Sequence, residues 1–159
     1  MEIYFFRHAD AGNKEAWSGP DRDRPLSAEG VTQARHVAEA LSGLRPGIPL
    51  IVSSPLVRAR QTAEIAAETL GCAERLADDE RLAHGFDRRS LAALVAEHAG
   101  ARVLLLVGHE PDFSATIAEV TGGTVTVKKA GVARIDFDEQ TTRGTLVWLL
   151  PPRPFVHER

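Results

Sequence analysis

Three short apolar segments of this chain each run into a basic side chain, and this repetition constrains the fold more than any other feature. The segments, with the basic residues that follow them, are 3–6 with Arg7 and His8, 50–52 with Arg58, and 103–107 with His109. A short apolar run bounded by polar residues is typical of a buried β-strand. In open α/β sheets, ligands bind at the carboxyl ends of the strands. The sequence therefore predicts that two arginines and two histidines meet at one edge of a sheet.

Segments with helical spacing alternate with these strands. The predicted helices cover about 27–43, 56–70, 91–98 and 111–120, with Ser27 and Ser90 as N-caps. A short strand and then a loop are possible over 74–88, further strands are predicted at 125–128, 132–137 and 145–150, and prolines after 150 are expected to lead into a loose tail. Strand–helix–strand units imply parallel pairing. We therefore expect an α/β three-layer sandwich, with a mostly parallel central sheet, helices on both faces and antiparallel C-terminal edge strands.

The composition narrows the class of protein. A chain of 159 residues is the size of one domain, and a formal net charge of −3 offers no basic surface for nucleic acid or an anionic membrane. Cys72 is the only cysteine, which excludes an internal disulfide and a zinc site made of cysteines. The first residues are expected to form a strand and no signal peptide is expected, and no apolar stretch approaches the roughly 20 residues of a membrane span. A cytoplasmic protein is expected.

The predicted cluster of basic side chains suits a phosphoryl dianion. An arginine presents a planar pair of donors to two phosphate oxygens, and a neutral imidazole can attack phosphorus and form a covalent phosphohistidine. Arg58 would lie in the first turn of a helix, which is unfavourable for a cation unless an anion is bound nearby. Zinc binding by His8 and His109 is the competing use, but the neighbouring arginines would repel a cation. No metal and no cofactor are therefore expected.

Three strings of the sequence also carry a family resemblance. They are Arg7-His8-Ala9-Asp10-Ala11, Ser53-Ser54-Pro55-Leu56-x-Arg58-Ala59-x-Gln61-Thr62-Ala63 and Val107-Gly108-His109-Glu110-Pro111. In this order they resemble the motifs of the histidine phosphatase superfamily, also called phosphoglycerate-mutase-like. The small size, Ala9 and the segments 23–30 and 129–133 resemble its short branch, the bacterial phosphohistidine phosphatases of SixA type.

The resemblance implies a role for each of these residues. His8 would be the phosphorylated nucleophile, and Arg7, Arg58 and His109 would hold the phosphoryl oxygens. Larger members carry a glutamate that protonates the leaving group. In the string Glu80-Arg81-Leu82-Ala83-His84-Gly85 the candidate for this role is Glu80, and Asp10 is the alternative.

The resemblance also bears on the substrate. Members that act on small molecules cover them with an insertion, whereas here only residues 86–102 separate Gly85 from Val103. Ala11 replaces a threonine of the larger members, so a hydroxyl contact is lost. We expect residues 1–159 to form a single domain without a lid insertion, a metal-independent phosphatase acting on phosphohistidine of a protein such as a phosphotransfer domain. A phosphatase of small phosphomonoesters and a non-catalytic phosphate-binding module are the alternatives.

Overall fold

The computed structural model describes residues 1–153, so the expected loose tail at 154–159 lies outside the described residues. The strands are β1 (Glu2–Arg7), β2 (Ile51–Ser53), β3 (Leu76–Asp78), β4 (Val103–Gly108), β5 (Val132–Asp138) and β6 (Arg143–Leu150). The α-helices are α1 (Ala28–Gly43), α2 (Val57–Leu70), α3 (Arg88–Glu97) and α4 (Asp112–Thr121). Short 3-10 turns occupy Lys14–Ala16, Asp21–Asp23, Ala73–Arg75 and Glu80–Leu82.

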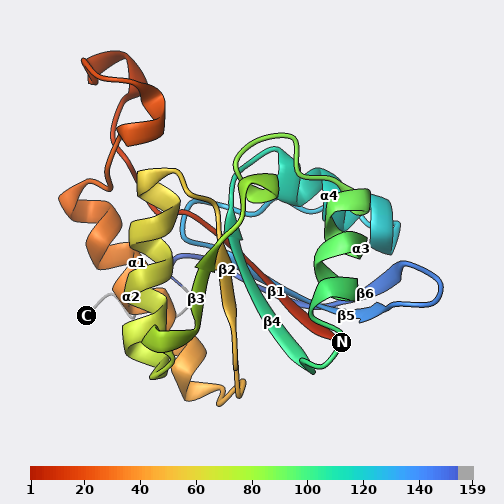
Figure 1. Ribbon diagram of the computed structural model, residues 1–159. Helices are drawn as coiled ribbons and strands as arrows, with labels where there is room; N and C mark the ends of the chain where they lie inside the picture. The colour runs from red at the N-terminus through yellow and green to blue at the C-terminus, as the bar shows by residue number, and fades with distance from the viewer. Residues whose placement is uncertain (154–159) are drawn as a thin grey trace.

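The strands form one six-stranded sheet in the order β3-β2-β4-β1-β5-β6. β3, β2, β4 and β1 are parallel to one another, and β5 and β6 continue the sheet in antiparallel pairing. Helices α1 and α2 cover one face of the sheet and α3 and α4 cover the other (Figure 1). The predicted three-layer α/β sandwich with antiparallel C-terminal edge strands is confirmed.

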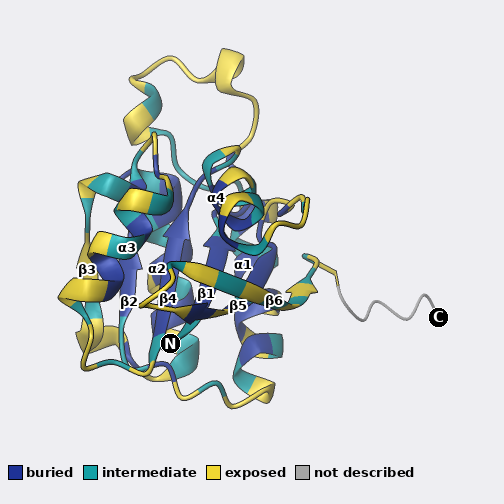
Figure 2. Cartoon of the chain, turned by 90° about the vertical axis from the view of Figure 1, so that its right-hand side faces the viewer, coloured by how far each residue is buried: buried dark blue, intermediate teal, exposed yellow. Residues whose placement is uncertain are grey.

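The continuous apolar run of β1 is explained by burial on both faces. Tyr4 and Phe6 join the core under α1 and α2, whereas Ile3 and Phe5 join the core under α3 and α4. Alternate residues of a strand point to opposite faces, so a strand covered on both sides must be apolar throughout. Figure 2 shows this pattern as buried central strands between helices whose outer surfaces are exposed, whereas the edge strands β3 and β6 are largely exposed or intermediate.

Two sequence predictions about the elements are wrong. The N-cap of α3 is Asp87, whose side chain accepts a hydrogen bond from the backbone N–H of Ser90 at 2.9 Å. The helix therefore begins three residues earlier than predicted with Ser90 as its cap. Residues 125–128 form no strand. β5 already occupies the free edge of β1, and Val127 is buried against the α3/α4 layer instead.

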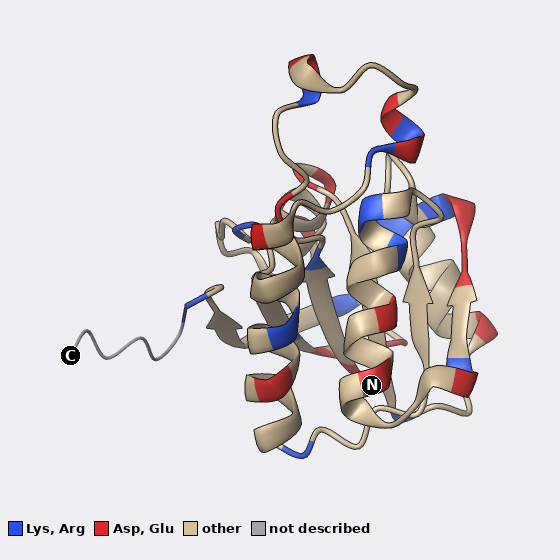
Figure 3. Ribbon diagram, turned by 90° about the vertical axis from the view of Figure 1, so that its left-hand side faces the viewer, with Lys and Arg blue, Asp and Glu red and all other residues tan. Residues whose placement is uncertain are grey.

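The segment 12–24, which we call the arm, projects from the end of the sheet where β1 ends (Figures 1 and 2). Its side chains are charged with both signs (Figure 3) and most of its residues are exposed. Arg24 anchors its base, because Nη1 donates to the carbonyl oxygens of Ala11 at 2.9 Å and Gly12 at 3.1 Å. Over the described residues 1–153, none of the helices combines the length and apolar character needed to span a bilayer.

Helix α1 approaches the chain beyond β1 very closely at Gly30. The predicted cap is confirmed, since Ser27 Oγ accepts from Gly30 N at 3.0 Å and donates to the Asp10 carboxylate at 2.6 Å. A Cβ at position 30 would lie 1.9 Å from the carbonyl oxygen of Asp10. Only glycine fits at position 30. The residue that it contacts, Asp10, lies two residues beyond His8 in the chain.

We expect Gly30→Ala to lower the free energy of unfolding by about 1–3 kcal/mol, the usual cost of forcing an extra methyl into a packed contact. Urea unfolding followed by circular dichroism measures this change. Gly43→Ala, at the other end of α1, is the matched control because no atom lies within 4 Å of the added methyl. The control should be unchanged or stabilised by about 0.5–1 kcal/mol, since alanine favours a helix over glycine. Equal destabilisation by both variants would contradict the close contact.

Candidate active site

The parallel pairing of β1 with β4 brings two of the predicted residues together. Arg7 is paired with Gly108 in the register, and the next residues of the two strands are His8 and His109. The backbone N–H of His8 donates to the carbonyl of Gly108 at 3.0 Å. The centroids of the two imidazole rings are 5.1 Å apart. The sequence prediction that these histidines meet at one sheet edge is therefore correct.

His8 is held as a neutral imidazole with one defined tautomer. Its Nδ1 lies 2.7 Å from the carbonyl oxygen of Ala9. Because a carbonyl oxygen only accepts, Nδ1 must carry the proton, which leaves the lone pair on Nε2. Burial and, to a smaller degree, the charges of Arg58 and Arg7 lower the pKa of His8 to about 3, although the hydrogen bond to Ala9 opposes them. At neutral pH the ring is therefore uncharged, with its lone pair on Nε2.

His109 is oriented by Ser54, which leaves β2. Ser54 Oγ accepts from Leu56 N at 3.2 Å, so its hydroxyl hydrogen is free to point at His109 Nε2, 2.8 Å away. When Ser54 donates this bond, the imidazole proton lies on Nδ1, which is buried and has no hydrogen-bond partner within residues 1–153. Burial lowers the pKa of His109 to about 2, with the charges of His8 and Arg58 contributing. His109 thus presents an unused N–H donor.

Arg58 lies in the first turn of α2, as predicted, and is buried. A cation in the first turn of a helix requires a nearby anion, and for Arg58 the arm supplies it. Asp21 accepts hydrogen bonds from Arg58 through its carbonyl oxygen at 2.9 Å and through its carboxylate at 3.2 Å. Burial would raise the pKa of Asp21, but the hydrogen bond from Arg24 and the charge of Arg58 outweigh it and lower the pKa. Asp21 therefore stays ionised beside the two arginines.

These side chains line a cavity of about 290 Å³ at the carboxyl end of the parallel strands. The cations around it are Arg7, Lys14, Arg24, Arg58 and Lys129, against the two carboxylates Asp21 and Glu110. Of the described side chains, four have a buried nitrogen without a hydrogen-bond partner, and three of these side chains line the cavity, namely Arg7 (Nε), Arg58 (Nε) and His109 (Nδ1). The positive charge of the cavity and these unpaired polar atoms are properties that suit an anion with several acceptor oxygens.

Neither predicted proton donor lines this cavity. The side chain of Glu80 is 72% exposed and its carboxylate is 2.6 Å from Arg22 of the arm. Asp10 is bound by Lys129 at 2.7 Å and by Ser27 at 2.6 Å. The hydrogen bonds from Lys129 and Ser27 lower the pKa of Asp10 to about 2. The structure brings together Arg7, His8, Arg58 and His109, and it leaves Glu80 and Asp10 outside.

Several cavity residues were not singled out from the sequence. Asp21 and Arg24 come from the arm, where charged residues are common and give no local signal. His84 lines the cavity as well, and its ring centroid is 5.0 Å from that of His109. The only signal for His84 was its place in the same string as Glu80, four residues further along.

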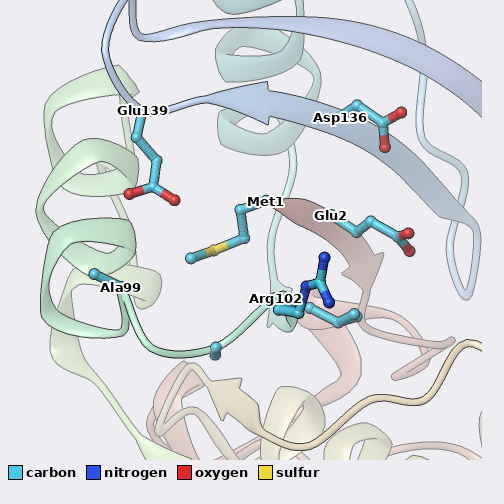
Figure 4. Close-up of a pocket in the computed structure, with 8 residues that line it drawn as sticks. Met1, Glu2, Ala99, Arg102, Asp136 and Glu139 are labelled. Atoms are coloured by element: carbon cyan, nitrogen blue, oxygen red, sulfur yellow. The ribbon is translucent and has the colours of Figure 1, made fainter.

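A larger cavity, of about 530 Å³, lies at the opposite end of the sheet (Figure 4). It is lined by the amino ends of β1 and β4, with Met1, Glu2, Arg102 and Asp136 among its residues. None of the predicted site residues contributes to it. Size alone therefore does not identify the functional cavity. No group of three or more histidine, cysteine or carboxylate side chains within residues 1–153 is arranged to hold a metal ion.

Comparisons with known proteins agree with this geometry. The family model described as "Histidine phosphatase superfamily (branch 1)" matches residues 3–84. An uncharacterized protein of Picosynechococcus sp. is 39% identical over 142 residues, which cover 83% of this chain and 82% of that protein. The probable phosphoglycerate mutase GpmB of Enterobacter sp. is 36% identical over 115 residues, 69% of this chain and 52% of GpmB. The chain thus spans about half the length of GpmB.

A solved structure matches almost the whole chain. The protein histidine phosphatase SixA, solved in complex with tungstate, superposes with a TM-score of 0.86 and 26% sequence identity. The match covers 96% of this chain and 97% of SixA, so no large segment distinguishes the two. The family model, the relatives and this shared architecture show that the chain belongs to the histidine phosphatase superfamily, in its short, SixA-type branch.

Proposed function

We propose that this protein is a phosphatase that transfers a phosphoryl group to His8 and then to water, and that its substrate is phosphohistidine on another protein. One observation carries the proposal. Arg7, Arg58 and His109, each with a buried nitrogen that lacks a hydrogen-bond partner, line one cavity with an imidazole that burial keeps neutral. A phosphoryl dianion supplies the acceptors that these donors lack. Membership of the superfamily and the likeness to SixA support the same chemistry.

The reaction follows from the tautomer of His8. The Nε2 lone pair forms a bond to phosphorus while the bond to the leaving group breaks, and the proton stays on Nδ1, which donates it in a hydrogen bond to the carbonyl oxygen of Ala9. Arg7, Arg58 and His109 hold the three phosphoryl oxygens as charge develops on them. A water molecule then attacks phosphorus and the electron pair of the N–P bond returns to His8. No metal ion and no cofactor takes part in this scheme.

Two features of the chain support a protein as the substrate. Between Gly85 and Val103 the only regular element is α3, and its apolar side chains pack into the core beneath the sheet instead of covering the cavity. We therefore propose a single domain without a lid insertion, whose cavity can take a phosphoryl group displayed on a folded surface. Ala11 at the cavity wall has no hydroxyl to bind a small sugar phosphate. SixA, which matches the chain end to end, is itself a protein histidine phosphatase.

A phosphatase of small phosphomonoesters is the second candidate. The sequence similarity to GpmB favours it, since phosphoglycerate is a small phosphate ester. The similarity covers 52% of GpmB, however, and leaves the rest of that protein without a counterpart in this chain. A non-catalytic phosphate-binding module would use the same cations, but it would not need His8 neutral and free at Nε2.

Replacing His8 should abolish turnover, because no other side chain in the cavity offers a free imidazole lone pair beside the two arginines. Rapid quenching without acid, followed by mass spectrometry of labelled enzyme, should find the phosphoryl group on His8. His36, exposed on α1, provides the matched control, and His36→Ala should keep wild-type activity. Unchanged turnover in His8→Ala would eliminate the proposed intermediate.

Arg7, Arg58 and His109 should act as one clamp on the phosphoryl group. Loss of any one should reduce transition-state stabilisation by about 2.7–4 kcal/mol, as for a removed oxyanion donor. Double variants should lose less than the sum, since the groups act as a unit. Steady-state kinetics and calorimetric titration with tungstate measure both effects. Arg35→Ala, on the exposed face of α1, is the control, and strictly additive losses would argue against a shared ligand.

Wild-type enzyme should show a higher kcat/KM for a phosphohistidine-bearing phosphotransfer protein than for phosphoglycerate or sugar phosphates. The open cavity lets a protein surface approach, whereas a small ester gains little binding energy from an uncovered site. Release of inorganic phosphate from a matched panel of these substrates measures the preference. A higher kcat/KM for a small ester would contradict the protein substrate and favour a phosphatase of small phosphomonoesters. The mechanism through His8 would be unaffected.

A further inference from the structure

The proposed function leaves one requirement unmet, which is a proton for the leaving group. Asp21 cannot supply it, because two arginines keep its carboxylate ionised. Glu80 faces Arg22 and solvent. Glu110 lines the cavity, but its Oε1 is engaged by a hydrogen bond from Ser114 N in the first turn of α4 at 3.0 Å. None of the three carboxylates is thus arranged as an acid.

His84 occupies the position that these carboxylates leave open. Its ring centroid is 5.0 Å from that of His109, and the centroid of His109 is 5.1 Å from that of His8. A phosphoryl group held by His109 would therefore lie near both His8 and His84. The leaving group in a displacement departs opposite to the nucleophile. Of the three imidazoles that line the cavity, His84 is the one that the transfer to His8 does not use.

The segment that carries His84 is anchored on both sides. Leu82 and Phe86 are buried in the core under α3 and α4. Gly85, between them, has a positive φ of 82° and donates its N–H to the Asp112 carboxylate at 2.8 Å. His84 itself is exposed at the rim of the cavity, where it can exchange protons with water. Its backbone is thus fixed while its ring stays in contact with both solvent and cavity.

We infer that His84 is the general acid and base of the reaction, an inference that rests on the proposed phosphatase function. In the first step the imidazolium of His84 gives its proton to the leaving oxygen or nitrogen, which receives the electron pair of the breaking bond to phosphorus. His84 is then neutral. In the second step it takes a proton from the water that attacks phosphorus, and the N–P electron pair returns to His8. Phosphate is released and His84 is again protonated.

Positive charge predominates among the side chains around His84. The side chains that share the cavity with it are the cations Arg7, Lys14, Arg24, Arg58 and Lys129, the imidazoles of His8 and His109, and the carboxylates Asp21 and Glu110. A bound phosphoryl dianion would offset two of these positive charges.

A leaving-group series tests the inference. Aryl phosphates with phenols of increasing pKa, extended to an alkyl phosphate, are compared in wild type, His84→Asn and His84→Ala. A good leaving group departs without a proton, so kcat/KM for the most acidic phenol should be nearly unchanged. For the poorest leaving group we expect a loss of roughly 10²–10⁴-fold, the usual contribution of general acid catalysis. Added imidazole should restore part of the activity of His84→Ala, because the vacated site opens to solvent.

Two control variants assign the effect. Glu110→Gln and Glu80→Gln should keep the wild-type dependence on leaving-group pKa, and tungstate binding by every variant reports whether the cavity is intact. An unchanged dependence in both His84 variants, or a steeper one in Glu110→Gln or Glu80→Gln instead, would overturn the role of His84 while turnover through His8 continues. If wild type hydrolyses neither the esters nor a phosphohistidine protein, the proposed function itself fails, and the inference fails with it.

Discussion

β1 and β4 pair in parallel with Arg7 opposite Gly108, and the chain leaves both strands directly beyond that pair. His8 and His109 therefore emerge side by side, and a bond from His8 N to the Gly108 carbonyl continues the ladder past the end of the strand. The register itself is set by packing, because both strands are buried on both faces. A slip of one residue would exchange the side chains of the two cores. The distance between the two imidazoles is thus maintained by the apolar core on either side of the sheet.

The same burial gives the site its chemistry. Removing His8 from water disfavours its charged form and leaves it a neutral base, while the arginines beside it remain charged because guanidinium does not lose its proton in proteins. Asp21 compensates Arg58 only in part, and three buried N–H groups stay without acceptors. A protein core rarely tolerates such groups. Under the proposed function, a bound phosphoryl group supplies the missing acceptors.

The arm links the site to the surface of the molecule. Its most exposed contact, between Arg22 and Glu80, joins two solvated side chains and contributes little to stability. The pair of Asp21 with Arg58 is different, since the Arg58 side chain is only 5% exposed and loses its nearest counter-charge if the arm moves. Movement of the arm would also take Lys14, Asp21 and Arg24 away from the cavity. The arm is therefore a wall of the site as well as a projection beyond it.

Features that depend on neighbouring residues were predictable from the sequence. Apolar runs, the Ser27 cap and the left-handed Gly71 at the end of α2 are local, so the core strands, α1 and α2 follow from the chain alone. The meeting of Arg7, His8, Arg58 and His109 also followed, because parallel strands end at a common edge. The cap of α3 was missed because Asp87 and Ser90 are residue types that both favour the N-cap and lie within one turn of each other. In the structure Asp87 is the cap, and its carboxylate accepts the hydrogen bond that Ser90 N donates.

Features that depend on distant parts of the chain were decided only by the tertiary structure. Whether 125–128 pairs as a strand depends on a free sheet edge, which β5 removes. The choice between Glu80 and His84 depends on which turn of the segment faces the cavity, and that is determined where Leu82 and Phe86 enter the core. The apolar runs and the periodicity of the chain determined a sheet edge at which Arg7, His8, Arg58 and His109 meet. Long-range packing decided which polar groups complete it, because a side chain reaches the cavity only where the core holds its backbone in place.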